Sequence, residues 1–408
     1  MEPLASPRGS SGDHGVANTA AQFGSGAVLA LMVGHCAGMI DLVALPVWVA
    51  TLIGAYHLEP QQAGALPTLF LGGAVASSLI FSARNATKRV RMAAPLGFAI
   101  AAVSFWAVSL ADAYLAKAAL HLAAGAAAGW ALSATHRMIG ASRNPHRLFA
   151  AAGLSLAIFG IAYLGITPGL VEKLGGAWFF RATACVLAVA AVVSAVAFPS
   201  PKTGIRPATE DVHLPGLSSA TWFGMVGIGC MALTQAMLFS FVSQIGINNG
   251  FGLKAVTAVL IALGFVNLAP APLAAVLQRR VDPRTVLLIG PLAQALIALA
   301  ISCSTAYASY AVATSMLSAV MIFTHTFAFG RLATLDPTGR AVAATPAMLM
   351  TGAAIGPILG GTLVQHLGYG SLGIAAVAIA VVSCLCFSRI PRFSASVGAA
   401  NEAQAPIY

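Results

Sequence analysis

The sequence predicts an all-α membrane protein with twelve transmembrane helices in two pseudo-symmetric six-helix halves. Composition is the first reason: 59% of the 408 residues are hydrophobic and only 8% are charged, whereas an ordinary soluble domain is about 25% charged. The second reason is that the basic residues are sorted between alternate gaps in the apolar sequence. The third is a repeat that relates the first half of the chain to the second.

The sorting of basic residues predicts how the chain crosses the membrane. One set of alternate gaps holds only Lys117, Lys173, Arg181 and Lys254, which leaves 17 of the 21 Lys and Arg residues for the other gaps and the two termini. Cytoplasmic loops of membrane proteins retain Lys and Arg. We therefore expect a multi-pass protein of the cytoplasmic (inner) membrane with both termini in the cytoplasm. Contact with anionic lipid also explains the formal charge of +10 without a nucleic-acid partner.

Each predicted helix is an apolar run close to the length of about 20 residues that crosses a bilayer. In the first half these runs are 26–54, 64–84, 92–111, 114–136, 147–170 and 178–199. In the second half they are 220–246, 253–276, 284–304, 306–330, 340–365 and 368–388. Backbone groups in lipid need internal partners, and segments this long and apolar find them as helices.

A polar, proline-containing stretch at 200–218 divides the chain and is expected to be a cytoplasmic linker. It separates a first half, 23–199, from a second half, 219–390. The polar ends of the chain, 1–22 and 391–408, are expected to be disordered cytoplasmic tails.

The two halves repeat each other in sequence. Leu170 to Gly175 reads Leu-Val-Glu-Lys-Leu-Gly, and Leu363 to Gly368, 193 positions later, reads Leu-Val-Gln-His-Leu-Gly. The same offset relates Arg147 to Arg340. This agreement in register indicates a six-helix duplication, a plan in which transporters place the solute site between the halves.

Short basic loops occur at corresponding places in the two halves. The loop between the eighth and ninth predicted helices reads Arg-Arg-Val-Asp-Pro-Arg from Arg279 to Arg284, and 84–89 reads Arg-Asn-Ala-Thr-Lys-Arg. The loop from Arg279 to Arg284 is similar to the D-R-x-G-x-R-R loop of the major facilitator superfamily, with Arg279 in place of Asp and Asp282 in place of Gly.

The eleventh predicted helix supports the same resemblance. It contains small residues at four-residue spacing, which let helices approach closely, and a proline, which bends a helix. The chain thus resembles a twelve-helix major facilitator over essentially its whole length. The resemblance implies alternating access and conformational-switch roles for Gly352, Gly356, Pro357, Gly360 and Gly361 in this helix, and for Arg84, Lys88, Arg89, Arg280, Asp282 and Arg284 in the loops.

Drug-exporting relatives have a similar glycine and proline run in helix 5. The fifth predicted helix of this chain has only Gly160, Gly165, Pro168 and Gly169. This difference argues against a drug exporter, but import and export both stay open.

Asp41 is the acidic residue placed deepest in a predicted helix. A charge at the bilayer centre costs at least about 2.5 kcal/mol, so this side chain should face protein or water. It shares a helical face with Gly34, Gly38 and Leu45. We expect Asp41 to bind the coupling proton; the alternative is a structural carboxyl group bonded to a neighbouring helix.

Polar and aromatic side chains in four predicted helices are candidates for the solute cavity. In the superfamily, helices 1, 4, 7 and 10 line that cavity. The candidates are His35, His121, Trp130, Gln235, Gln244 and His325. Histidine can also carry protons near neutral pH, so a proton relay is a second role for these histidines, and satisfied hydrogen-bonding or packing residues are the alternative for the whole set.

The expected function is a secondary active transporter, not an enzyme, that moves a small organic solute across the cytoplasmic membrane with proton coupling. An efflux antiporter for drugs or metabolites is the alternative. A transition-metal transporter is a weaker one, because the intramembrane His, Cys and Asp residues lack a metal-ligand spacing. Without a Lys or Arg in mid-membrane, a neutral, cationic or weakly acidic solute is favoured over a polyanion. No cofactor and no metal site are expected, and the protein is expected to be a monomer in the lipid bilayer.

Overall fold

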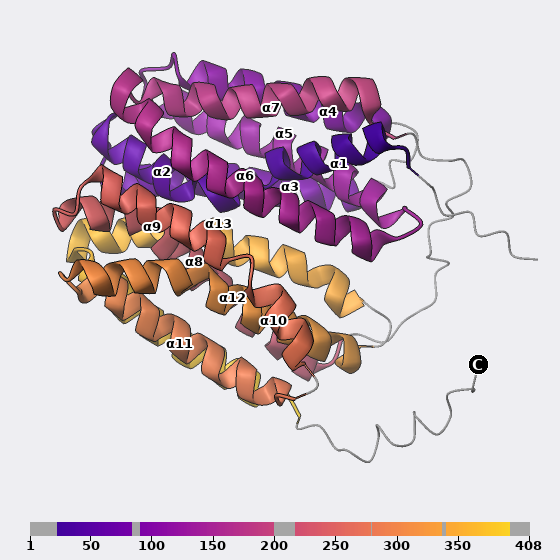
Figure 1. The fold of residues 1–408 in the computed structure, drawn as a ribbon, viewed down its shortest axis with the longest axis vertical. Coiled ribbons are helices and arrows are strands. Elements are labelled where there is room, and N and C mark those ends of the chain that lie inside the picture. The colour runs from indigo at the N-terminus through magenta and orange to yellow at the C-terminus, as the bar shows by residue number, and fades with distance from the viewer. Residues whose placement is uncertain (1–22, 84–89, 200–216, 279, 337–339, 392–408) are drawn as a thin grey trace, which may run out of the picture.

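The computed structural model describes residues 23–83, 90–199, 217–278, 280–336 and 340–391, and its regular elements are α-helices (Figure 1). Twelve segments are long and apolar enough to cross a membrane. The predicted fold class is therefore confirmed. The first half comprises α1 (Ser25–Gly38), α2 (Asp41–Gly54), α3 (Pro60–Ala83), α4 (Val90–Val108), α5 (Tyr114–Gly140), α6 (Pro145–Leu174) and α7 (Ala177–Ala197).

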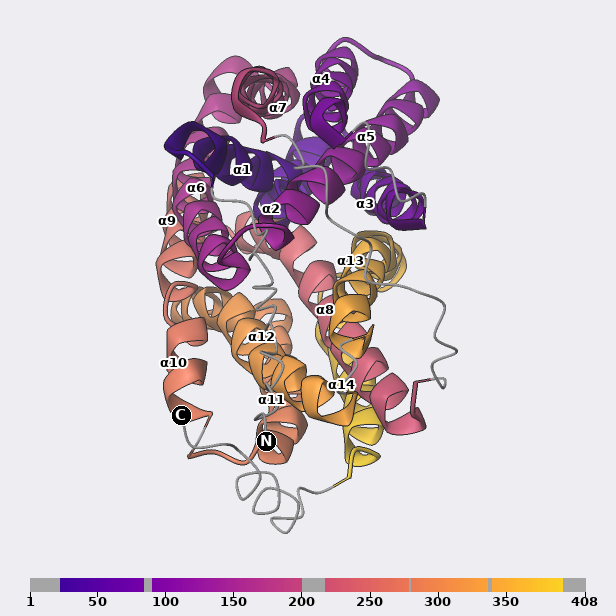
Figure 2. The ribbon, with the colours of Figure 1, turned by 90° about the vertical axis from the view of Figure 1, so that its right-hand side faces the viewer.

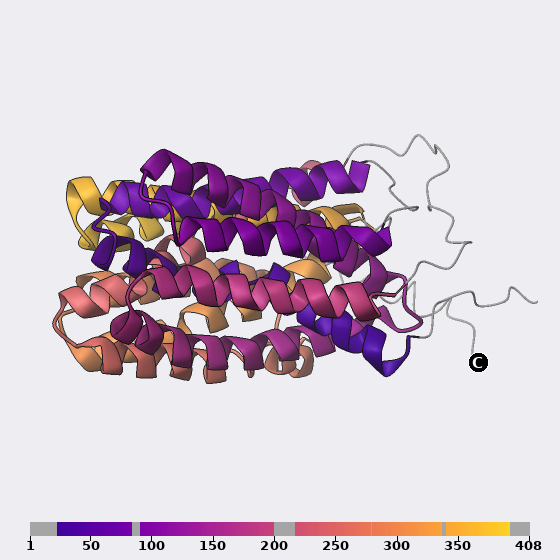
Figure 3. The same cartoon turned by 90° about the horizontal axis from the view of Figure 1, so that it is seen from above.

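The second half repeats this arrangement. It comprises α8 (Ser219–Asn248), α9 (Leu253–Val266), α10 (Pro270–Leu277), α11 (Pro283–Cys303), α12 (Tyr307–Leu335), α13 (Arg340–Leu367) and α14 (Gly370–Ser388). Figure 2 shows the two halves on either side of a common boundary, and Figure 3 shows the helices running lengthwise. We call the end where α1 begins and α14 ends the terminal end, and the opposite end the far end.

Two spans are broken where continuous helices were predicted. The predicted helix 26–54 is interrupted at Met39 and Ile40, so it forms α1 and α2. The predicted helix 253–276 is interrupted at 267–269, so it forms α9 and α10. These two predictions of continuity were wrong. Proline explains the second break, because it lacks an N–H group and favours the first position of a new helix, which Pro270 occupies in α10.

The two halves contact each other toward the far end. There α3 packs against α13, α2 against α8, and α6 against α9. The terminal-end pieces of the broken spans pack within their own halves, α1 against α5, α6 and α7, and α10 against α12. The breaks therefore lie where each span passes from contact with the other half to contact with its own.

Hydrogen bonds join α3 to α13 across this boundary. The backbone N–H of Gln61 donates to Oε1 of Gln365 at 3.1 Å, and the backbone N–H of Ile358 donates to Oγ1 of Thr68 at 3.2 Å. Gly64 lies directly against the carbonyl of Pro357, so a Cβ atom there would collide with backbone. The close approach of the two helices therefore depends on a residue without a side chain.

The glycine run of α13 mainly faces its own half. Gly352, Gly356 and Gly360 pack against α8, where a Cβ atom on Gly356 would lie 2.6 Å from the Cβ of Ala236. Gly361 points instead at the start of α3. The small-residue face thus fixes α13 on α8 and presents its far-end part to the other half.

Candidate functional site

Asp41 is the first residue of α2, directly after the break in the first span. Its side chain is only 7% exposed, and the backbone N–H of Leu42 next to it donates to the carbonyl of Met39 at 3.2 Å. The N–H groups of Val43 and Ala44 donate to the carbonyl of Ile40 at 3.1 and 2.8 Å, so the first turn of α2 bonds back onto the break. Asp41 is about 24 Å along the helix axis from Ser25 and about 20 Å from Gly54, near the middle of the span.

His35 of α1 makes a direct contact with His136 of α5. The Nδ1 atom of His35 lies 3.0 Å from Nε2 of His136, and the ring centroids are 5.2 Å apart. The ring of Phe149 in α6 packs against His136 at 5.6 Å. The sequence did not single out His136, because its partner is 101 positions away and no local spacing links them.

His121 lies in an aromatic core and not at the boundary of the halves. Its Nδ1 donates to the carbonyl of Lys117 at 2.6 Å, and its Nε2 accepts from Nε1 of Trp48 at 3.2 Å. The side chain is fully buried. Its ring contacts Trp48, Phe105 and Phe180. Since both ring nitrogens are occupied, the structure favours a packing role for His121.

Gln235 of α8 belongs to a polar network that reaches two neighbouring helices. Its Nε2 donates to Oγ of Ser318 in α12 at 2.7 Å, and its Oε1 accepts from Nε2 of Gln294 in α11 at 3.4 Å. Gln294 is 1% exposed and also donates to the carbonyl of Met231. A buried amide needs such partners, so the network positions Gln235.

Gln244 and Trp130 lie away from this network. Gln244 is half-buried in α8 and is hydrogen-bonded to the side chain of Tyr369, just before α14 at the far end. Trp130 is half-buried in α5 and packs edge-on against Phe81 of α3, with centroids 5.0 Å apart. Each contact lies within one half of the molecule, so neither residue is shown to meet a solute.

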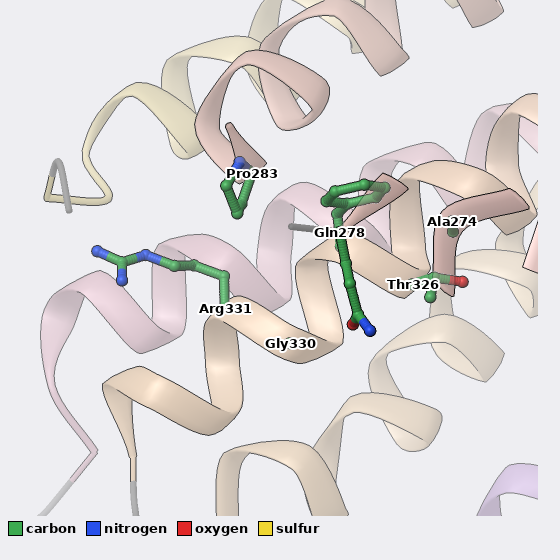
Figure 4. A pocket seen from close by; sticks show the side chains of 7 residues that line it. Ala274, Gln278, Pro283, Thr326, Gly330 and Arg331 are labelled. Atoms are coloured by element: carbon green, nitrogen blue, oxygen red, sulfur yellow. The ribbon is translucent and has the colours of Figure 1, made fainter. Parts of the chain in front are cut away.

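His325 lies on α12 beside a small pocket near the terminal end. Its Nδ1 donates to the carbonyl of Met321 at 3.0 Å. The pocket is about 150 Å³ in volume and is lined by Ala274, Gln278, Pro283, Thr326, Phe327, Gly330 and Arg331 (Figure 4). Solute pockets usually measure about 300–1,000 Å³, so this one is too small for most organic solutes.

Two of the loop residues proposed as switches, Asp282 and Arg284, bind helix ends. The Oδ2 atom of Asp282 accepts from the backbone N–H of Thr285 at 3.1 Å and caps α11. Arg284 donates to the carbonyls of Ile390 and Ser388 at 2.7 and 3.1 Å, so it binds the end of α14. Arg280 is exposed. The remaining candidates, Arg84, Lys88 and Arg89, lie outside the described residues.

No cluster of three or more His, Cys, Asp or Glu side chains suited to a metal occurs within the described residues. The contact between His35 of α1 and His136 of α5 brings together only two such side chains. The candidate site therefore consists of Asp41, His35 and His136, with Gln235 in the other half.

Comparison with known families decides the identity of the fold. Residues 30–338 match the Major Facilitator Superfamily. The chain belongs to the major facilitator superfamily. This membership confirms the resemblance found in the sequence and indicates a secondary transporter. A search of curated proteins found no match to the chain.

Several solved structures share this major facilitator fold. A bacterial homologue of the human lysosomal transporter Spinster, inward-facing and unoccupied, is 14% identical over 90% of this chain and 98% of its own, with a TM-score of 0.67. The nucleoside transporter NupG is 13% identical over 90% and 99%, with a TM-score of 0.69. A POT family transporter in complex with 5-aminolevulinic acid is 12% identical over 90% and 96%, also at 0.69. At these identities the likeness concerns the fold alone.

Proposed function

We propose that this transporter moves a small organic solute by alternating access and that Asp41 binds the coupling proton. The observation that carries the proposal is the place of Asp41: a buried carboxyl group, in mid-span, at the break of the first span. A carboxyl group inside a membrane is costly and is retained mainly where it has a function. As the two halves rock, the surroundings of this break change, and with them the stability of the charged form.

The contacts between the halves support alternating access. The halves are joined toward the far end, whereas α1 and α10 pack on their own halves toward the terminal end. Such an arrangement gives solute a route from the terminal end, and the reverse arrangement would give one from the far end. If the basic terminal-end loops lie in the cytoplasm, the described state opens inward.

The distribution of basic groups supports a solute that is not a polyanion. Every described Lys or Arg within a span lies in the first or last two turns of that span. Lys117 is the most buried of them, and its Nζ atom already donates to the carbonyls of Ala111 and Asp112. A multiply charged anion would therefore find no cation beside Asp41, so a neutral, cationic or weakly acidic solute fits better.

The test begins with a thermal-shift screen of purified protein against organic solutes, followed by uptake of each hit into proteoliposomes. An imposed pH gradient should drive accumulation of the solute above its external concentration, and a protonophore should abolish that accumulation. Solute that only equilibrates, with or without the pH gradient, would contradict proton coupling. Vesicles of both orientations would also show the direction of transport.

A further inference from the structure

The contact between His35 and His136 joins two titratable rings inside the bundle. Their facing nitrogens, Nδ1 of His35 and Nε2 of His136, are 3.0 Å apart. A neutral imidazole has one N–H donor and one acceptor nitrogen, so two facing rings share a single N–H···N hydrogen bond. Such a pair can accept a proton on one outer nitrogen and release one from the other without moving its rings.

The pair is held in place by close packing of α1 on α5. A Cβ atom on Gly34 would lie 3.1 Å from Oγ1 of Thr135, and one on Gly38 would lie 2.9 Å from the Cβ of Leu132. Glycine at these two positions therefore lets the two helices approach so closely that the imidazole rings of His35 and His136 can contact each other. The rings are brought together by the backbone contact and not by flexible side chains.

The order of the three groups along the bundle points from the terminal end to mid-span. His136 is four residues from Gly140, the terminal-end residue of α5, or about 6 Å along its axis. His35 precedes Asp41 by six residues, or about 9 Å along the first span. The contacting pair of His35 and His136 thus lies on the terminal-end side of Asp41.

Other titratable groups lie on the first span and on the helices that pack around the pair. The neighbouring helices contribute Arg91, Cys36, Asp41, Arg137, His146, Arg147, Glu172, Lys173, Arg181, Cys185, Lys117 and His121. Among the described residues, the hydrogen bonds of the two rings join them only to each other. Their outer nitrogens, Nε2 of His35 and Nδ1 of His136, are the atoms at which the pair would gain and lose a proton.

We infer that His35 and His136 form a proton relay between the terminal end and Asp41. This inference rests on the proposed function, because Asp41 is its proton acceptor. A proton binds to Nδ1 of His136, the proton on Nε2 of His136 passes to Nδ1 of His35, and the proton on Nε2 of His35 leaves toward Asp41 through water. One N–H bond forms and one breaks at each ring, and the pair holds one extra proton at a time, since two protonated rings at this distance repel each other.

The test follows protonation of Asp41 by time-resolved infrared spectroscopy after flash release of a caged proton, on the full chain in lipid nanodiscs. The carboxylic C=O band that Asp41→Asn removes reports the acceptor, so no solute is needed. We expect His35→Gln and His136→Gln each to slow the rise of this band by about tenfold or more. His366→Gln is the matched control, because that histidine is exposed at the far end of α13, and it should leave the rate unchanged.

Chemical rescue separates a relay from a structural role. Free imidazole added to His136→Ala should restore the rate at which the Asp41 band rises, since imidazole can occupy the space left by the side chain and carry the proton. A buffer of equal ionic strength without imidazole should not restore it. An unchanged rate in both glutamine variants would overturn the relay and leave Asp41 as the coupling residue. A wild-type protein without a titrating Asp41 band would instead overturn the proposed coupling, and the relay with it.

Discussion

The backbone N–H of Gln61 donates to Oε1 of Gln365 at 3.1 Å, so α3 and α13 are hydrogen-bonded across the boundary of the two halves. The partners lie at the far end, where these helices approach through Gly64 and Gly361. This contact joins the two halves at the far end, and the proposed alternating access requires that it break. We therefore expect substitutions at the far-end contact to shift the conformational equilibrium.

Gly64→Val should open the far end, because its side chain would meet the carbonyl of Pro357. Spin labels attached at Glu59→Cys and Leu367→Cys in a cysteine-free background would report the separation of the halves. Pulsed electron paramagnetic resonance measures the distance between the two labels. We expect a longer mean distance in the Gly64→Val protein. Gly72→Val is the matched control on the same helix, since a Cβ atom there meets nothing within 4 Å. Equal distances in all three proteins would refute this role of the α3–α13 contact.

Gly356→Leu should destabilise the second half by wedging α13 away from α8. Overpacking a tight interface typically costs about 1–3 kcal/mol, and the neighbouring Ala236 belongs to a helix backbone that cannot move aside. Thermal unfolding in detergent measures the loss. Gly153→Leu in α6, where a Cβ atom meets nothing within 4 Å, provides the control and should unfold close to the wild type. An unfolding midpoint for Gly356→Leu equal to that of the wild type would show that the interface between α13 and α8 accommodates the larger side chain.

His121→Leu should lower stability without a specific effect on proton coupling. The substitution leaves the buried N–H of Trp48 without an acceptor, which costs about 1–3 kcal/mol. Trp48→Phe removes the donor, so the double variant should lose less than the sum of the single variants. Additive losses in the unfolding midpoint would mean that this hydrogen bond contributes little.

Arg284→Lys should loosen the end of α14 nearly as much as Arg284→Ala. The guanidinium group donates to two carbonyls at once, those of Ile390 and Ser388, and an ammonium group lacks this fork of donors. Hydrogen exchange of the last turn of α14 is the measurement, with exposed Arg389→Ala as the control. Full protection of the last turn of α14 from hydrogen exchange in Arg284→Lys would show that the two hydrogen bonds of the guanidinium group are not required.

Most of the fold could be predicted from the sequence. The apolar runs predict the number of spans, which the structure confirms, because hydrophobic thickness acts locally along the chain. The basic gaps predict the direction of the spans across the membrane, and this stays a prediction. The breaks were missed for a different reason. Pro270 was a visible signal within an apparent helix, but Gly38 and Met39 are not, and the end of α1 there depends on packing against α5.

The candidate site could be predicted only in part. Asp41 was identifiable from its depth in an apolar run. His136 was not, because it lies at the end of a predicted helix and gains its importance from a contact with α1. His121 carried the same sequence signal as His35, and only the aromatic neighbours in three dimensions distinguish the packed ring from the paired one.

The most direct test of the central claim compares wild-type protein with Asp41→Asn in proteoliposomes, using a solute found by the screen. Asparagine keeps the size and hydrogen-bonding capacity of the side chain but cannot bind and release a proton near neutral pH. We predict that Asp41→Asn loses accumulation driven by a pH gradient and retains counterflow, the exchange of labelled for unlabelled solute. Undiminished pH-driven accumulation in this variant would contradict the assignment of Asp41 as the coupling residue.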